Sequence, residues 1–160
     1  MGEPSKTQCV LIFRRTYDAP IARVWRAWTD AAELGKWFLA GDDHVVHFAE
    51  VDLRVGGCFC VSFGPPGKPP YTETNRYTEV APPTRLAWTG DMTVGGEAIE
   101  GGGASVLELV DLGDSRTELI LTNTGDEDLW RHGEGWLPCL ASLERHLAAA
   151  VTPTSAEATA

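Results

Sequence analysis

A histidine and a glutamate stand two residues apart in the segment HGEGWLPCL, at His132 and Glu134. Two such side chains within hydrogen-bond reach are suited to general acid–base catalysis, because one can release the proton that the other takes up. The same residues also fit an exposed turn of a helix whose charges face water, so both interpretations stay open. Gly133, Gly135 and Pro138 are disfavoured inside a helix. We expect the helix to bend here and to leave room beneath it.

Residue types that bind metals gather in two places. In DDHVVH two carboxylates precede His44 and His47, but residues three apart on a strand point to opposite faces. We interpret this segment as a solvated acidic edge, with a metal site as the alternative if a loop gathers the ligands. Cys58 and Cys60 fall on one face of a likely strand, with a spacer shorter than zinc sites prefer. They are interpreted as small buried thiols, and all four cysteines are expected to be reduced.

The sequence carries no nucleophile elbow, metalloprotease helix, Walker loop or dinucleotide fingerprint. The glycine-rich stretch GGEAIEGGG (95–103) is not followed by a helix that could present its N terminus to a phosphate. We interpret it as a flexible connection between strands. Asp52 and Arg54 alternate on one strand face and are interpreted as structural, with a ligand acid group as the alternative partner of Arg54. We therefore predict no catalytic residue, no metal and no cofactor.

Composition limits the partners that the chain can bind. Its 160 residues fit one domain, and its net charge of -10 argues against nucleic acid and anionic membranes as partners. No run of 18 apolar residues occurs, and the first residues lack the apolar stretch of a signal peptide. We expect a cytoplasmic protein, with an N-terminal tail over 1–8, a single domain over 9–150 and a disordered C-terminal tail over 151–160.

Hydrophobic periodicity predicts the order of the elements. A strand is expected at 9–18, followed by two short helices, the second of which begins with Asp30 as its cap and can end at Gly35. From about 45 to 124, strands with one apolar face alternate with Gly/Pro turns, and a long helix with a leucine stripe follows. This order predicts an α+β fold. A curved antiparallel sheet of about seven strands wraps around a long C-terminal helix, and two short helices follow the first strand.

Four stretches carry a resemblance to a known family: APIARVWRAWTDAAELGKWF, VDLRVGGCF, RYTEVAPPTRLAWT and GEGW. In this order and spacing they resemble the activator-of-Hsp90-ATPase-homologue-like family of the START-like, helix-grip (SRPBCC) superfamily, over about residues 9 to 149. The resemblance implies a helix-grip fold with a cavity between the sheet and the long helix. Asn75 stands where the family usually has glycine, which implies a narrower cavity with an added polar group.

The resemblance and the helix bend together indicate ligand-binding residues. The family places Trp37, Trp88 and Trp136 near the space between helix and sheet, although such an aromatic set more often forms core. With the strand and helix residues that face this space, the predicted site consists of Trp37, Phe59, Asn75, Tyr77, Trp88, Trp136 and Leu140.

The predicted function is that of a carrier or sensor for a small apolar molecule. The alternatives are a chaperone regulator or other protein-interaction module, and a cofactor-free enzyme that acts on a hydrophobic substrate. The expected partner is a small apolar molecule, or a protein in the first alternative, and not nucleic acid or a membrane. The chain is expected to be a monomer or a homodimer.

Overall fold

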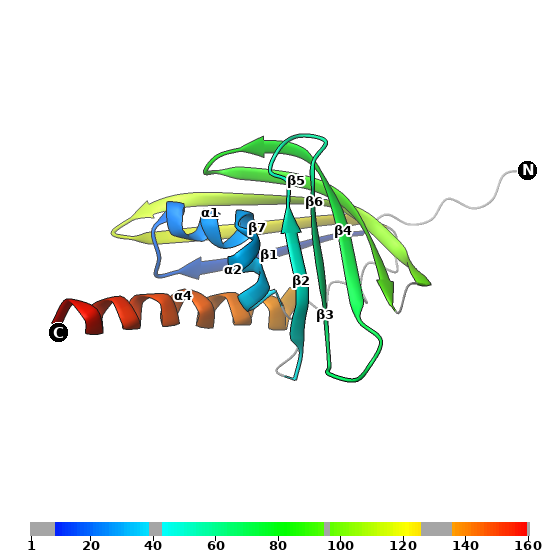
Figure 1. The fold of residues 1–160 in the computed structure, drawn as a ribbon. Helices are drawn as coiled ribbons and strands as arrows, with labels where there is room; N and C mark the ends of the chain where they lie inside the picture. Colours follow the sequence, from blue (N-terminus) through cyan, green and yellow to red (C-terminus); the bar gives the residue numbers. More distant parts are fainter. Residues whose placement is uncertain (1–8, 39–42, 95–96, 126–135, 160) are drawn as a thin grey trace, which may run out of the picture.

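Seven strands and three helices form the described part of the chain, which comprises residues 9–38, 43–94, 97–125 and 136–159 of this computed structural model (Figure 1). In chain order the elements are β1 (Cys9–Tyr17), α1 (Ile21–Thr29), α2 (Ala31–Trp37), β2 (Val45–Val51), β3 (Cys58–Gly64), β4 (Tyr71–Ala81), β5 (Arg85–Val94), β6 (Glu97–Gly113), β7 (Arg116–Gly125) and α4 (Trp136–Thr159). The order confirms the predicted α+β, helix-grip fold.

The sheet is an antiparallel meander whose first strand pairs with its last. Its strand order is β1-β7-β6-β5-β4-β3-β2, and every neighbouring pair is antiparallel. Figure 1 shows the sheet curving around the helices, with α4 running along its concave side. Side chains alternate between the two faces of each strand, so one set of alternate residues forms the core, including Phe59, Val61 and Phe63 of β3. We call this helix-facing side the inner face.

Turn chemistry explains the hairpins at one end of the sheet. Asp114 and Ser115 both have positive φ, 53° and 57°, as a two-residue hairpin turn of type I′ requires. The β4–β5 turn contains the cis peptide Pro82–Pro83. Between β2 and β3, Gly56 has a φ of 85°, a conformation that glycine adopts without steric strain.

The glycine-rich stretch 95–103 was predicted to be a flexible connection, and for residues 97–103 this was wrong. β6 begins at Glu97 and pairs with β5, including Ile99 opposite Met92 and Gly103 opposite Gly90. These cross-strand hydrogen bonds satisfy the backbone despite the low strand propensity of glycine. A register shift between Gly90 and Met92 accommodates the extra residues of β6.

The two short helices are held by one cap and one buried tryptophan. Asp30 caps α2 as predicted, since its carboxylate accepts hydrogen bonds from the backbone N–H groups of Ala32 (2.8 Å) and Glu33 (3.3 Å). The helix does not end at Gly35 but continues to Trp37. The reason is tertiary: the Trp37 side chain is fully buried and its Nε1 donates to the Ala27 carbonyl at 2.8 Å.

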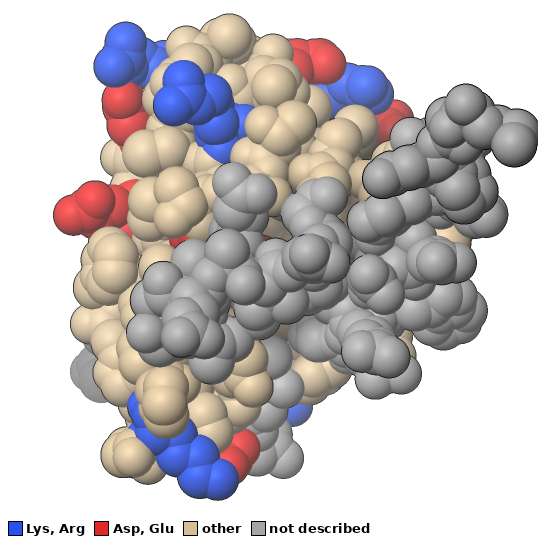
Figure 2. Space-filling view, turned by 90° about the vertical axis from the view of Figure 1, so that its right-hand side faces the viewer, with Lys and Arg blue, Asp and Glu red and all other residues tan. Residues whose placement is uncertain are grey.

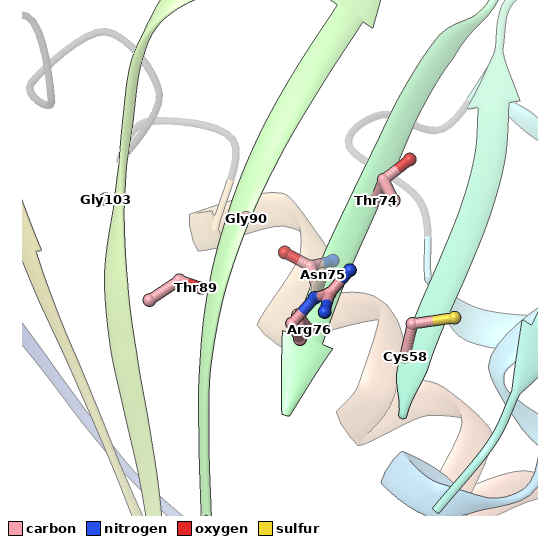
Figure 3. A pocket seen from close by; sticks show the side chains of 7 residues that line it. All are labelled: Cys58, Thr74, Asn75, Arg76, Thr89, Gly90 and Gly103. Atoms are coloured by element: carbon pink, nitrogen blue, oxygen red, sulfur yellow. The ribbon is translucent and has the colours of Figure 1, made fainter. Parts of the chain in front are cut away.

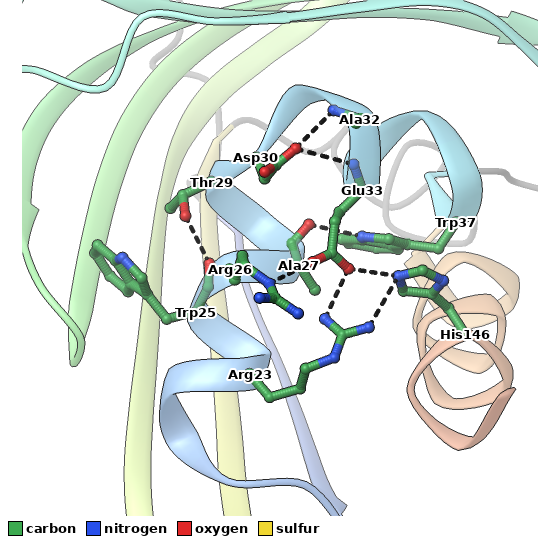
Figure 4. A network of polar contacts seen from close by, with 10 residues as sticks. All are labelled: Arg23, Trp25, Arg26, Ala27, Thr29, Asp30, Ala32, Glu33, Trp37 and His146. Atoms are coloured by element: carbon green, nitrogen blue, oxygen red, sulfur yellow. Dashed lines mark hydrogen bonds and ion pairs between the residues drawn. The ribbon is translucent and has the colours of Figure 1, made fainter. Parts of the chain in front are cut away.

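A half-buried carboxylate joins all three helices (Figure 4). Glu33 of α2 accepts hydrogen bonds from Arg23 Nη1 (2.7 Å) and Arg26 Nε (2.7 Å) of α1. It also pairs with His146 Nε2 of α4 at 2.8 Å. Burial raises the pKa of Glu33, but the hydrogen bonds from His146, Arg23 and Arg26 outweigh it and hold that pKa below its ordinary value. This network sets the position of α4 against the short helices.

Helix α4 packs a stripe of side chains against the sheet, with Leu140, Leu143 and Leu147 buried at three-and-four spacing. The helix continues to Thr159, so it extends into the 151–160 segment for which the sequence predicts a disordered tail. Pro138 lies in the first turn of its described part. His132, Gly133, Glu134 and Gly135 lie outside the described residues, so the acid–base pair and the helix bend stay predictions. No helix in the described ranges is long and apolar enough to cross a membrane.

Candidate ligand-binding site

Three predicted site residues from adjacent strands come together on the inner face. Phe59 of β3 packs against both Tyr77 of β4 and Trp88 of β5, with ring centroids 5.5 Å and 5.2 Å away. Tyr77 and Trp88 are themselves cross-strand partners. All three are buried. Strand alternation therefore gives this part of the sheet an aromatic floor.

Two residues that the sequence analysis did not assign to the site connect this floor to the helices. Trp28 of α1 lies 6.0 Å from both Trp88 and Trp136, measured between ring centroids. Phe38, which follows α2, lies 6.3 Å from Phe59 and 5.7 Å from Trp136. Both residues were visible in the sequence as apolar residues of the short helical segments, but nothing there indicated that they reach the sheet.

We call this set the aromatic cluster; its members are Trp28, Trp37, Phe38, Phe59, Phe63, Tyr77, Trp88 and Trp136. Trp37 and Leu140, both predicted to contact ligand, are fully buried. Their polar groups form hydrogen bonds within the protein. The indole N–H of Trp37 donates to the Ala27 carbonyl, and the Leu140 carbonyl accepts from the Tyr17 hydroxyl at 3.1 Å. The interior around Trp28 is thus filled by side chains, whereas Trp136 is only half-buried.

Asn75 places a carboxamide among these apolar groups. It is 4% exposed, lies on the inner face beside Phe59 and covers Gly90 of β5. A Cβ atom on Gly90 would collide with the Asn75 side chain, so the absence of a side chain at Gly90 makes room for the amide. The Asn75 Nδ2 atom is buried and has no hydrogen-bond partner.

Other buried polar atoms nearby are also unpaired. They are the indole Nε1 of Trp28, the imidazole Nδ1 of His44, the hydroxyl of Tyr77 and the Nδ2 of Asn123, whose Oδ1 accepts from Ser105 Oγ at 2.6 Å. Burial raises the pKa of the Tyr77 phenol above its ordinary value, so it stays protonated and able to donate. A buried donor without a partner is uncommon in native proteins and calls for a physical explanation.

One end of the aromatic cluster carries titratable groups. Alternation along β4 places Tyr71 and Glu73 on the same inner face as Asn75. His44, before β2, stacks on Tyr71 with centroids 6.1 Å apart and lies 5.9 Å from Phe63. We call His44, Tyr71, Glu73 and Asn75 the polar end of the site. The half-buried Glu73 side chain loses hydration, which raises the pKa of its carboxyl to about 7.

The segment DDHVVH was predicted to be a solvated acidic edge; Asp43 and His47 are exposed, but for His44 the prediction was wrong. Its side chain is only 12% exposed because the rings of Phe63 and Tyr71 cover it. Glu73 was missed altogether. The alternation of YTETNRYTEV contained the signal, since Tyr71, Glu73, Asn75 and Tyr77 share one parity.

The other predicted chemical groups lie away from this site. Cys58 and Cys60 are on the outer face of β3 and are half-buried free thiols. Desolvation and the neighbouring Cys58 raise the pKa of Cys60. Arg54 donates from Nε to Asp52 Oδ2 at 2.9 Å, and both side chains are exposed. This surface pair fits the structural interpretation of Arg54.

The opposite face of the sheet carries a hollow of about 530 Å³ (Figure 3). Cys58, Arg76 and Thr89 line it from adjacent strands as cross-strand partners. They alternate with Phe59, Tyr77 and Trp88 and therefore point away from the aromatic cluster. The remaining lining residues are Thr74, Asn75, Gly90 and Gly103. This hollow is less suited to an apolar ligand than the inner face is, because it is open and is lined by the guanidinium of Arg76 and the hydroxyls of Thr74 and Thr89.

Comparison with known proteins gives a consistent picture. The family model described as Activator of Hsp90 ATPase homolog 1-like protein matches residues 18–148. The solved structure of Mll3558 from Rhizobium loti is 25% identical, with a TM-score of 0.74, and the match covers 90% of this chain and 100% of that one. CV1439 from Chromobacterium violaceum is 25% identical, with a TM-score of 0.73 and coverages of 86% and 96%.

A third solved structure, the AHSA1-like protein from Aeromonas hydrophila, shares the fold at 23% identity. Its TM-score is 0.72, and the match covers 88% of this chain and 94% of that one. No curated protein matches the chain.

Proposed function

The chain belongs to the Activator of Hsp90 ATPase homolog 1-like family, and from this premise we propose that it binds a small hydrophobic ligand as a carrier or sensor. The ligand lies on the inner face of the sheet, at the partly covered end of the aromatic cluster. Here Trp136, Tyr71 and Glu73 are half-buried, whereas the interior around Trp28 is filled. Helix-grip proteins of this kind commonly bind hydrophobic molecules between sheet and helix.

The observation that carries this proposal is the unpaired Nδ2 of Asn75. Leaving a buried donor without a partner destabilises a protein by about 1–3 kcal/mol. A ligand oxygen bound next to Asn75 would satisfy this donor, while Phe59 and the other rings cover the ligand's apolar body. The ligand is therefore an apolar molecule that carries at least one hydrogen-bond acceptor.

The first test titrates the protein with Prodan, an uncharged naphthalene ketone whose emission shifts to the blue in apolar surroundings. We expect saturable binding with a blue shift. Asn75→Leu replaces the amide by an apolar group of similar size. It should keep the protein folded and weaken Prodan binding about fivefold, since one neutral hydrogen bond contributes about 1 kcal/mol.

The matched control is Thr74→Val, on the same strand but on the outer face, where Thr74 is exposed and lines the hollow. This variant should bind Prodan as the wild type does. Absence of saturable binding to the wild type would contradict the proposal. Weaker binding by Thr74→Val with unchanged binding by Asn75→Leu would place the probe in the outer hollow instead.

A further inference from the structure

We propose that the ligand ends in a protonated amine, which forms an ion pair with Glu73 beside the rings of Tyr71 and Phe63. This inference rests on the proposed function and specifies the chemistry of the ligand. It follows from the juxtaposition of an unpaired carboxyl group, two aromatic faces and an apolar interior at the polar end of the site.

The position of Glu73 follows from strand register. It lies opposite the fully buried Val61 of β3 and between Tyr71 and Asn75 on the inner side of β4. A glutamate at this place in an amphipathic strand faces the core side of the sheet instead of the solvent. Among the described residues, no hydrogen bond or ion pair to the Glu73 carboxyl is present.

The surroundings of Glu73 favour a cationic terminal group on the ligand over a neutral or anionic one. The rings of Phe63 and Tyr71 are diagonal and same-strand neighbours of Glu73 and stack on each other, 5.8 Å apart. The π faces of aromatic rings attract ammonium groups, most strongly where water is excluded. The chain carries 13 basic and 23 acidic residues, so its net field also attracts a cation and repels an anion.

The raised pKa of Glu73 agrees with this assignment. Desolvation raises the pKa of the carboxyl to about 7, which shows that no positive charge of the described protein offsets the loss of hydration. An ammonium group bound at Glu73 would supply that charge. Asn75 is the next residue along the inner face. Its Nδ2 donates to a hydrogen-bond acceptor that the ligand carries close to its amine.

A row of packed aromatic rings leads from the neighbourhood of Glu73 toward Trp136. Phe63 lies 5.9 Å from Phe38, and Phe38 lies 5.7 Å from Trp136, measured between ring centroids. An alkyl or aryl body attached to the amine therefore runs from the polar end toward the half-buried Trp136. This geometry points to amphiphilic amines as the ligand class.

The test compares three competitors of Prodan that share one tail: decylamine, decanol and decanoate, with the two ions kept below their micelle-forming concentrations and decanol below its solubility limit. At about pH 8, where Glu73 is mostly ionised, the wild type should bind decylamine at least about tenfold more tightly than decanol. Decanoate should bind most weakly. In Glu73→Gln the affinities for decylamine and decanol should become equal to within about twofold.

Glu50→Gln is the matched control, since it removes the same charge from an exposed position on the neighbouring strand β2. It should keep the amine preference. Equal affinities for decylamine and decanol in the wild type, or an amine preference that survives in Glu73→Gln, would overturn the inference while Prodan binding leaves the proposed function intact. Failure of the wild type to bind Prodan or any of the three competitors would instead overturn the proposed function.

Discussion

Glu73 and Asn75 are neighbours on one face of β4, yet only one of them was predicted to belong to the site. Asn75 was found because it replaces a glycine that the family usually has. Glu73 was missed because a charged residue in a strand is normally assigned to the solvent face. The alternation of side chains along β4, counted from the buried Tyr77, would have placed both Glu73 and Asn75 on the inner face. The unpaired Nδ2 of Asn75 was beyond sequence analysis, because it depends on which atoms surround the amide.

At the same scale, Glu73 makes the stability of the free protein depend on pH. Its pKa is about 7 in the folded protein and 4.5 ordinarily, so the folded state binds the proton more tightly. The protonated carboxyl therefore contributes to the free energy of unfolding. This contribution is fully present below about pH 4.5 and is lost as pH rises through about 7. Glu73→Gln removes this loss. The variant should therefore be more stable than the wild type at about pH 8, by on the order of 1–2 kcal/mol.

Urea unfolding of both proteins without ligand, at about pH 4.5 and about pH 8, measures this difference. The extra stability of Glu73→Gln over the wild type should be largest at about pH 8 and small at about pH 4.5. Glu50→Gln, whose side chain is exposed, should show no such dependence. A constant difference between Glu73→Gln and the wild type across this range would show that the carboxyl is not desolvated.

At the scale of the elements, periodicity predicted the helices and strands well but not their ends or their contacts. The first strand and the two short helices came from local patterns. Gly35 does not end α2, because the buried Trp37 two residues further on holds the helix together. Glu33 had the spacing of a capping box, but its side chain does not turn back to Asp30. It binds Arg23 and Arg26 instead, and also His146, which lies 113 residues away in the sequence.

The network around Glu33 yields a prediction for helix docking. Glu33→Gln should destabilise the protein by about 2 kcal/mol at neutral pH, because the charged hydrogen bonds that join α2 to α1 and α4 become neutral. The folded-state pKa of Glu33 lies below its ordinary value, so its contribution is present above the ordinary pKa and is lost as pH falls through the folded value. The penalty of the substitution should therefore shrink in acid.

Urea denaturation of Glu33→Gln at neutral pH and at about pH 3 measures this change. Glu144→Gln is the control, since Glu144 is an exposed carboxylate on α4. This substitution should change the free energy of unfolding by only about a few tenths of a kcal/mol. A penalty of equal size at both pH values would mean that the network depends on the shape of Glu33 and not on its charge.

At the scale of the whole molecule, the charge distribution agrees with a small ligand better than with a polyanion. On the face shown in Figure 2, basic side chains lie near acidic ones at the margins, with uncharged residues between them. A nucleic-acid interface needs basic residues gathered in a stripe or patch, and none is evident among the described residues of this face. That nucleic acid is not a partner stays a prediction from the net charge of -10.

The candidate site draws on every layer of the fold, and this determines how ligand binding affects unfolding. Phe59 and Glu73 belong to the sheet and Trp136 to α4, and Trp28 of α1 packs against Trp136. A ligand that contacts these elements binds the folded chain and not the unfolded one, so it stabilises the whole domain by mass action. At ten times its dissociation constant, decylamine should raise the free energy of unfolding by about 1.4 kcal/mol, which corresponds to an increase of about 3–6 °C in the melting temperature.

Thermal unfolding followed by circular dichroism measures this shift, and intrinsic tryptophan fluorescence should report the same midpoint, because Trp28, Trp88 and Trp136 join the sheet to the helices. Glu73→Gln at the same decylamine concentration should show a smaller increase, in proportion to its weaker binding. A wild-type melting temperature that stays constant as decylamine saturates would mean that the amine binds the unfolded chain as tightly as the folded one, contrary to a site formed by the fold. Two separate midpoints would mean that the ligand stabilises the sheet or the helices alone, contrary to a site built from both.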